Sequence, residues 1–141
     1  MTALSADRNT REAAGQIYSG PVAAAVKCYA GAMLVRDAAG NIKPGVTATG
    51  LVAAGRCEKY VDNTTGAAAD VDATYRPGIF RWANSAAADA ITKAEIGDDC
   101  YIVDDQTVAK TDGTGTRSVV GKVVDVDANG VWVATGIIGS F

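Results

Sequence analysis

Residues 119–133 read VVGKVVDVDANGVWV, which is two valine-rich runs separated by Asp127-Ala128-Asn129-Gly130. Valine is β-branched and favours extended backbone, and an Asn-Gly pair between two such runs favours a tight hairpin turn. The sequence therefore predicts an antiparallel hairpin with strands at 119–127 and 131–138. Trp132 is placed to pack across the two strands.

The rest of the chain repeats this pattern of short apolar runs between turn residues. Runs rich in Val, Ile, Ala and Tyr alternate with Gly, Asn and Asp at intervals of about ten residues, which is typical of all-β barrels and sandwiches. The further strands that we expect lie at 22–29, 33–37, 51–60, 72–82 and 101–103. The predicted fold class is mostly β: a compact β-barrel or sandwich.

One short helix is expected in the middle of the chain. Thr92-Lys93-Ala94-Glu95 has the spacing of a capping box, in which the threonine side chain accepts from a backbone N–H and the glutamate reaches back. Gly97 is placed to end the turn. Residues 84–90, which include three consecutive alanines, are interpreted as a loop or as the lead-in to this turn.

The first twenty residues differ from the rest. Residues 1–20 are polar, show no sustained period and end at Ser19-Gly20-Pro21. Such a segment is disordered or becomes ordered by lying on a neighbour. We expect an extended N-terminal arm at 1–20 and a single β domain at 21–141, since 141 residues is a common size for one domain.

Charge and hydropathy argue against several partners. The net charge is −3, and the thirteen Lys and Arg residues are scattered, so the sequence gives no electrostatic footprint for nucleic acid or anionic lipid. The start of the chain lacks the apolar run of a signal peptide, and no run of eighteen apolar residues occurs. We therefore expect a soluble protein made in the cytoplasm, with no nucleic-acid or membrane partner.

The side chains that most catalysts need are sparse. Histidine is absent, which removes the usual general base and the commonest metal ligand. Cys28, Cys57 and Cys100 are too widely spaced for a metal or redox motif and are expected to be buried free thiols. No serine lies in a nucleophile motif. We expect no enzyme activity and no catalytic, cofactor-binding or metal-binding residues.

Three local motifs have weak functional interpretations. Asp125 to Gly130 matches the first half of a calcium-binding EF-hand loop, but Gly136 stands where the bidentate carboxylate is needed, so a hairpin turn is preferred. Gly113 to Thr116 lacks the lysine of a phosphate-binding loop. Four acidic residues flank one short predicted strand and are interpreted as its solvated ends: Asp98, Asp99, Asp104 and Asp105.

Two apolar features are candidates for contact with a partner. Arginines and aromatic residues cluster around Pro77-Gly78, and these side chains dominate protein interfaces, although a hairpin or bulge with one core-facing edge explains them equally well. The residues are Tyr75, Arg76, Phe80, Arg81 and Trp82. At the C-terminus, Ile137, Ile138 and Phe141 need cover from the protein's own core or from a neighbouring subunit.

Several blocks of the sequence resemble one known family. They are Met1 to Thr10, Tyr29 to Val35, Ala48 to Arg56, Gly78 to Ser85 and Gly97 to Thr116, the last including Cys100-Tyr101-Ile102-Val103-Asp104-Asp105-Gln106-Thr107. These blocks are similar to the small decoration, or cement, proteins that coat the heads of tailed phages and prophages. The resemblance covers nearly the whole chain and rests on many short, glycine-punctuated blocks.

The resemblance implies a β domain on the outer surface of a phage head that bridges major capsid subunits and stabilises the shell, without catalysis or cofactor. Expected partners are the major capsid protein and neighbouring copies of the chain, as a trimer or a dimer. The contact candidates are Thr2, Leu4, Asp7, Arg8, Asn9 and Thr10 of the arm, together with Tyr75, Arg76, Phe80, Arg81 and Trp82.

Two alternatives stay open at this point. One is another virion component, such as a tail tube or a head–tail connector, which has a similar β composition but assembles as tubes or rings. The other is a small ligand- or carbohydrate-binding β domain. That function needs an exposed aromatic platform around Trp82 or Trp132.

Overall fold

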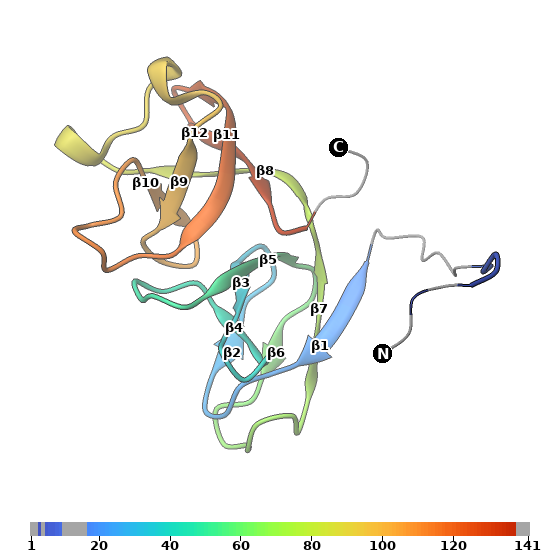
Figure 1. Cartoon of the computed structure of the whole chain (residues 1–141). Helices are drawn as coiled ribbons and strands as arrows, with labels where there is room; N and C mark the ends of the chain where they lie inside the picture. Colours follow the sequence, from blue (N-terminus) through green and yellow to red (C-terminus); the bar gives the residue numbers. More distant parts are fainter. Residues whose placement is uncertain (1–2, 4, 10–16, 138–141) are drawn as a thin grey trace.

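The computed structural model describes residues 3, 5–9 and 17–137, and within them the chain forms two β units that pack on each other. The first unit is built from β1 to β7, and the second, formed by β8 to β12, is a closed barrel (Figure 1). The prediction of a mostly β fold is confirmed. The prediction of one domain over 21–141 stays a prediction.

The first unit is a five-stranded antiparallel sheet that curls back on itself. Its strand order is β1 (Tyr18–Pro21), β7 (Asp72–Arg76), β5 (Val52–Cys57), β3 (Met33–Arg36) and β4 (Ile42–Pro44). Directly after β1, Val22 forms a parallel bridge with Ile42, and the Ala23 N–H donates to the Ile42 carbonyl at 2.8 Å. A small ribbon of β2 (Lys27–Cys28) and β6 (Val61–Asp62) completes the unit.

The second unit is the barrel that contains the predicted hairpin. Its strand order is β10 (Thr107–Ala109), β8 (Gly78–Asn84), β12 (Gly130–Thr135), β11 (Val119–Asp127) and β9 (Asp99–Ile102), closed by pairing of β9 with β10. Asp127 pairs with Gly130 and Val126 with Val131, which confirms the hairpin. Gly121 approaches the Ala134 carbonyl so closely that a Cβ atom would collide with it.

One predicted strand is divided in two. The sequence predicts a single strand at 72–82, but the structure interrupts it at Pro77. Arg76 pairs with Arg56 in the first sheet, whereas Gly78 pairs with Thr135 in the barrel. Proline has no N–H to donate to a ladder, so the chain leaves one sheet at this residue and enters the other.

The predicted helical turn is confirmed, as a 3₁₀ helix. In η2 (Lys93–Glu95) the Thr92 hydroxyl accepts from the Ala94 N–H at 3.3 Å, and the Glu95 carboxylate accepts from the Thr92 N–H at 2.7 Å. A further 3₁₀ turn, η1 (Ala87–Asp89), lies in the stretch interpreted as a loop or lead-in. Within the described ranges, no helix is long and apolar enough to cross a membrane.

The buried side chains form two clusters, one within the first unit and a larger one that joins the two units. The larger one fills the barrel and also includes Met33, Val35 and Ala53 from the first sheet, so the boundary between the units is itself packed core. The predicted burial of the three cysteines as free thiols is confirmed. Burial raises the pKa of Cys28 to about 11 and that of Cys100 to about 12, so both thiols stay neutral and unreactive at ordinary pH.

The N-terminal stretch contributes a strand. Residues 18–20 fall within the predicted arm, yet β1 pairs with β7 in the register Tyr18 to Tyr75. The two tyrosine rings stack at 6.0 Å between centroids, which adds side-chain packing to the backbone ladder. Any division between arm and body therefore lies before Tyr18.

Candidate docking surface

The structure describes part of the arm that was predicted to make contacts. Asp7, Arg8 and Asn9 are exposed. Thr2, Leu4 and Thr10 lie outside the described residues. The three described positions therefore present their side chains to solvent, as a partner contact requires.

The structure separates the second set of contact candidates into core and surface. Trp82 is 5 % exposed, and its indole N–H donates to the Thr135 hydroxyl at 3.0 Å. Tyr75 is 8 % exposed, and its hydroxyl accepts from the Arg36 guanidinium at 2.6 Å. Successive strand residues point to opposite faces, and these two positions face the cores. The remaining candidates, Arg76, Phe80 and Arg81, reach the surface.

On the outer face of the barrel, Arg81 lies against Trp132. The two residues are cross-strand partners of β8 and β12, and the guanidinium carbon lies 5.7 Å from the centroid of the indole ring. The Trp132 N–H donates to the Asp127 carboxylate at 3.0 Å, and this bond is the main reason that the pKa of Asp127 is lowered. The hairpin turn thus orients the indole, and the indole orients the arginine.

A second stacked pair lies where the two units meet. The guanidinium of Arg56 on β5 lies 4.6 Å from the centroid of Phe80 on β8. The Glu58 carboxylate forms ion pairs with the guanidinium groups of Arg56, at 2.9 Å, and of Arg76, at 3.2 Å. These ion pairs are partly exposed and add little stability, but they orient Arg56, which lies over the Phe80 ring, and hold Arg76 to the same carboxylate.

A third aromatic pair extends this surface onto the first unit. Tyr29 and Tyr60 are 54 % and 48 % exposed, and their rings lie 5.5 Å apart. The ammonium of Lys27 lies 5.5 Å from the Tyr29 ring. A shallow groove containing Arg56, Phe80, Arg81 and Trp132 and a second one containing Tyr29 share Gly31 in their walls, so the surface is continuous.

We name this region the aromatic surface. It comprises Tyr29, Arg56, Tyr60, Phe80, Arg81 and Trp132. Only Phe80 and Arg81 were contact candidates from the sequence. The other residues come from β5, β12 and the segments beside β2 and β6, which only the folded chain brings together. Trp132 alone carried a sequence signal, as a candidate aromatic platform.

The contacts made by Trp82 and Trp132 limit their use as an aromatic platform for carbohydrate binding. Trp82 is inside the barrel and cannot stack on a sugar. Trp132 has a guanidinium over its ring and its N–H already engaged by Asp127. A sugar therefore has one tryptophan to approach, and that one is partly covered.

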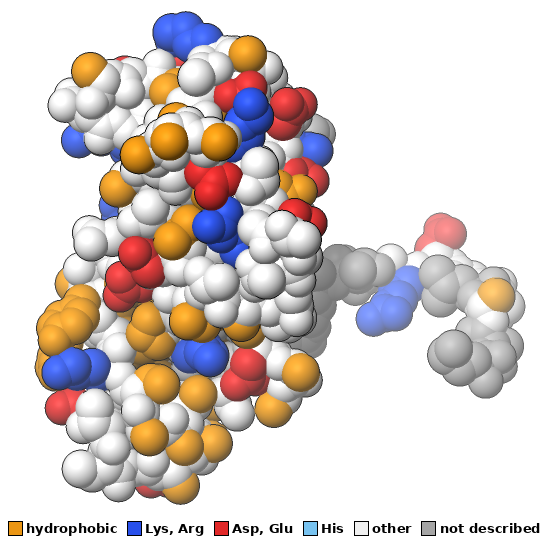
Figure 2. Space-filling view, turned by 90° about the vertical axis from the view of Figure 1, so that its left-hand side faces the viewer, with side chains coloured by type: hydrophobic (Ala, Val, Ile, Leu, Met, Phe, Trp, Pro, Cys, Tyr) orange, Lys and Arg blue, Asp and Glu red, His pale blue; other side chains and the backbone are white. Residues whose placement is uncertain are grey.

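Charged side chains are mixed over the molecule. In the view of Figure 2, acidic and basic side chains are interspersed, and hydrophobic side chains gather in the lower half, over the first β unit. In the calcium-like motif, Asp125 pairs with Lys93 at 2.9 Å. Among the described residues, no group of three or more His, Cys, Asp or Glu side chains could hold a metal ion.

Two of the four acidic residues around β9 have local partners for their carboxylates. Asp99 pairs with Lys122 at 2.9 Å, and the Asp104 carboxylate accepts from the Gln106 N–H at 2.9 Å. Burial is the main cause that raises the pKa of Asp105, and the neighbouring Asp104 adds to it. Asp98, Asp99 and Asp104 are exposed, as expected for the solvated ends of a strand, whereas Asp105 is half-buried.

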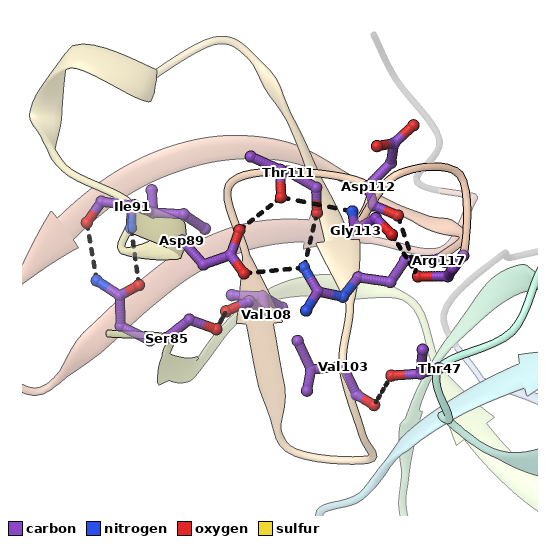
Figure 3. A network of polar contacts seen from close by, with 12 residues as sticks. Thr47, Ser85, Asp89, Ile91, Val103, Val108, Thr111, Asp112, Gly113 and Arg117 are labelled. Atoms are coloured by element: carbon purple, nitrogen blue, oxygen red, sulfur yellow. Dashed lines mark hydrogen bonds and ion pairs between the residues drawn. The ribbon is translucent and has the colours of Figure 1, made fainter. Parts of the chain in front are cut away.

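The glycine-rich segment 113–116 belongs to a polar network that fastens a loop to η1 (Figure 3). The Asp89 carboxylate accepts from the Thr111 hydroxyl at 2.5 Å and from the Arg117 guanidinium at 3.2 Å. Arg117 also donates to the Thr111 carbonyl at 3.0 Å. The network joins η1 to the connection between β10 and β11, so we interpret it as a structural brace.

Replacing Asp89 by asparagine should flatten the acid dependence of stability. The hydrogen bond from Thr111, together with Arg117, lowers the pKa of Asp89, so its contribution is present above the carboxyl's ordinary pKa of about 4 and is lost as the pH falls through the folded-state value. Urea midpoints at pH 7 and pH 3 measure this. We expect Asp89→Asn to lower the midpoint at pH 7 and to narrow the difference between the two pH values.

The matched control is Asp72→Asn, which neutralises an exposed carboxylate on β7. This variant should leave the pH dependence of the urea midpoint close to that of the unchanged protein. If Asp89→Asn and Asp72→Asn gave the same pH profile, the brace would have no role in acid stability.

Comparison with known proteins returned no match: no family model fits the chain, and no significant similarity to a curated protein or to a solved structure was found. The aromatic surface is therefore interpreted from its own geometry and chemistry.

Proposed function

We propose that this chain is a non-catalytic structural protein of a tailed phage or prophage, which decorates the outer surface of the head and bridges major capsid subunits. The observation that supports this most strongly is the aromatic surface, which runs across both β units. Tryptophan, tyrosine and arginine contribute most of the binding energy in protein interfaces, and here they lie together at the surface, partly or fully exposed.

The side chains of this surface are held in place before any partner binds. Arg81 rests on Trp132, Arg56 rests on Phe80, and Tyr29 packs against Tyr60. Long side chains that are already oriented lose less conformational entropy on binding, so more of the contact energy appears as affinity. A preorganised surface of this kind suits docking onto a fixed protein lattice.

Arg81 indicates the chemistry of the partner. Among the described residues it has no carboxylate within ion-pair distance, and its cation lies over an indole ring. A guanidinium offers five donors in a planar fork, which suits carboxylates and backbone carbonyls of another protein. We infer that the major capsid protein presents such acceptors to Arg81.

Bridging requires contacts with more than one subunit. The aromatic surface supplies one contact, and the exposed residues Asp7 to Asn9 of the arm supply another. When two modest contacts are linked in one chain, the second forms at a high effective concentration and the total affinity rises. Neighbouring copies around a two-fold or three-fold axis would extend the same effect over the shell.

Removing the arm should weaken head binding and leave the body folded. The deletion must end at residue 16, since Tyr18 begins a strand of the first sheet. The experiment is co-sedimentation of the full chain and of the shortened chain with undecorated phage heads. The full chain should pellet with the heads, and the shortened chain should pellet less at the same concentration.

Circular dichroism of the shortened chain, compared with the full chain, serves as the folding control. Equal pelleting of both folded chains would remove the arm from the proposal. Failure of the full chain to pellet, with tubes or rings forming instead, would favour a tail or connector component.

A further inference from the structure

The two grooves of the aromatic surface form one continuous path. Arg81 and Trp132 line the first groove, Tyr29 and Asp105 line the second, and Gly31 belongs to both. A Cβ atom built on Gly31 would meet no heavy atom within 4 Å beyond those of its chain neighbours, so the space above the junction is open. A single partner segment is therefore able to contact both grooves.

At the junction, the wall of the path is a tight turn that leaves one carbonyl free. The Ala32 N–H donates to the Tyr29 carbonyl at 3.1 Å, which closes the turn, and the Gly31 N–H donates to the Cys57 carbonyl of β5 at 2.8 Å. The N–H and C=O of one trans peptide group point in opposite directions, so the Ala30 carbonyl points away from β5. Ala30 is exposed, and no backbone N–H of the described residues donates to its carbonyl.

The two grooves carry unpaired groups of opposite charge. Arg81 in the first groove is exposed, and Asp105 in the second is half-buried. Among the described residues, neither side chain has an oppositely charged group within ion-pair distance. Removing a carboxylate from water without a cation beside it is unfavourable, so Asp105 gains most from a cation that a partner brings. The path thus matches a partner that presents a carboxylate to one groove and a cation to the other.

The free carbonyl of Ala30 favours an extended segment over a folded face as the occupant. Backbone N–H groups on the face of a folded domain are mostly engaged in its own helices and sheets. An extended segment still has its N–H groups free, and it directs successive side chains to alternate sides. Such a segment is able to donate to the Ala30 carbonyl while its side chains reach the rings and charges of the two grooves.

We propose that the path binds one extended segment of the major capsid protein, which places a carboxylate at Arg81, a main-chain N–H at the Ala30 carbonyl and a lysine or arginine at Asp105. This inference rests on the proposed function and narrows it, because it assigns the capsid contact to a linear segment with an acidic and a basic residue. It also gives Asp105 a role that is separate from the structure of β9.

The test uses overlapping synthetic peptides that cover the major capsid protein of the cognate phage. Fluorescence anisotropy measures their binding to the full chain, and one peptide that carries both charges should bind and should prevent pelleting of the chain with heads. Asp105→Lys should weaken the affinity for this peptide about tenfold or more. Asp98→Lys makes the same change of charge at an exposed residue outside the path and should leave the affinity unchanged.

A charge exchange identifies the pair of residues that meet. Replacing the basic residue of the bound peptide by glutamate should weaken its binding to the unchanged protein and restore its binding to Asp105→Lys. A restored affinity also shows that Asp105→Lys is folded.

A second pair of variants tests the path without changing a charge. Ala30→Trp adds a large side chain at an exposed position in the path and should weaken peptide binding, whereas Ala38→Trp adds the same side chain at an exposed turn outside it and should not. If the full chain pelleted with heads but bound no peptide, or if Asp105→Lys bound as well as Asp98→Lys, this inference would be overturned and head decoration would stand. Failure to pellet with heads would overturn both.

Discussion

Trp82→Ala should lower the free energy of unfolding by about 3 to 5 kcal/mol. The indole is one of the largest side chains inside the barrel, and its removal leaves a cavity that the surrounding strands can only partly close. The Thr135 hydroxyl, which is fully buried, also loses the N–H that donates to it at 3.0 Å. Domains of this size are stable by about 5 to 15 kcal/mol, so much of the total would be lost. Urea denaturation followed by circular dichroism measures the change.

The matched control is Trp132→Ala, which removes the same side chain from the outer face of the same barrel. Its ring is partly exposed and its hydrogen bond with Asp127 is at the surface, so a loss of about 1 kcal/mol is expected. A change of less than about 1 kcal/mol in Trp82→Ala would contradict the assignment of Trp82 to the core.

The second large effect concerns binding to phage heads. Arg81→Glu should weaken the affinity about 30-fold or more, because hot-spot residues at interfaces contribute about 2 kcal/mol or more each. The reversal replaces a donor that rests on Trp132 by an acceptor that faces acceptors of the partner. Titration of undecorated heads with the purified protein, followed by sedimentation, measures the affinity.

Two further variants test whether the loss of affinity arises from the aromatic surface. Trp132→Ala should also weaken binding, because it removes both an aromatic contact and the support of Arg81. Lys122→Ala removes a charge of the barrel that pairs with Asp99 and lies outside the aromatic surface, so binding should be unchanged. If Arg81→Glu and Lys122→Ala bound equally well, the aromatic surface would not be the capsid contact.

Local sequence patterns predicted the parts of the fold that local chemistry determines. The hairpin follows from valine runs on either side of Asn129-Gly130, and the 3₁₀ turn from the capping box of Thr92 and Glu95. In both cases the residues that make the structure are near neighbours in the chain. The mostly β class follows from the repeated spacing of turn residues.

Features that depend on distant residues were not predicted. Pro77 ends one strand and lets the next join a different sheet, but the sequence gives no sign of where that second strand will pair. The strand at Tyr18 exists because β7 offers it an edge. The two short strands β4 and β10 are likewise defined by their partners.

The aromatic surface likewise depends partly on local sequence patterns and partly on contacts between distant residues. Alternation along β8 places Arg81 and Trp82 on opposite faces, but it does not tell which face is inside, so Trp82 was grouped with surface residues. Tyr29 and Tyr60 approach each other only in the folded chain. A surface made of residues from five segments is therefore beyond the reach of sequence patterns.

The central claim, decoration of a phage head, is tested most directly by cryo-electron microscopy of undecorated heads of the cognate phage mixed with the purified protein. The account predicts regular density at symmetry-related sites on the outer shell, with the aromatic surface facing the major capsid protein. Bare shells, with the protein free in solution or assembled into tubes, would contradict it.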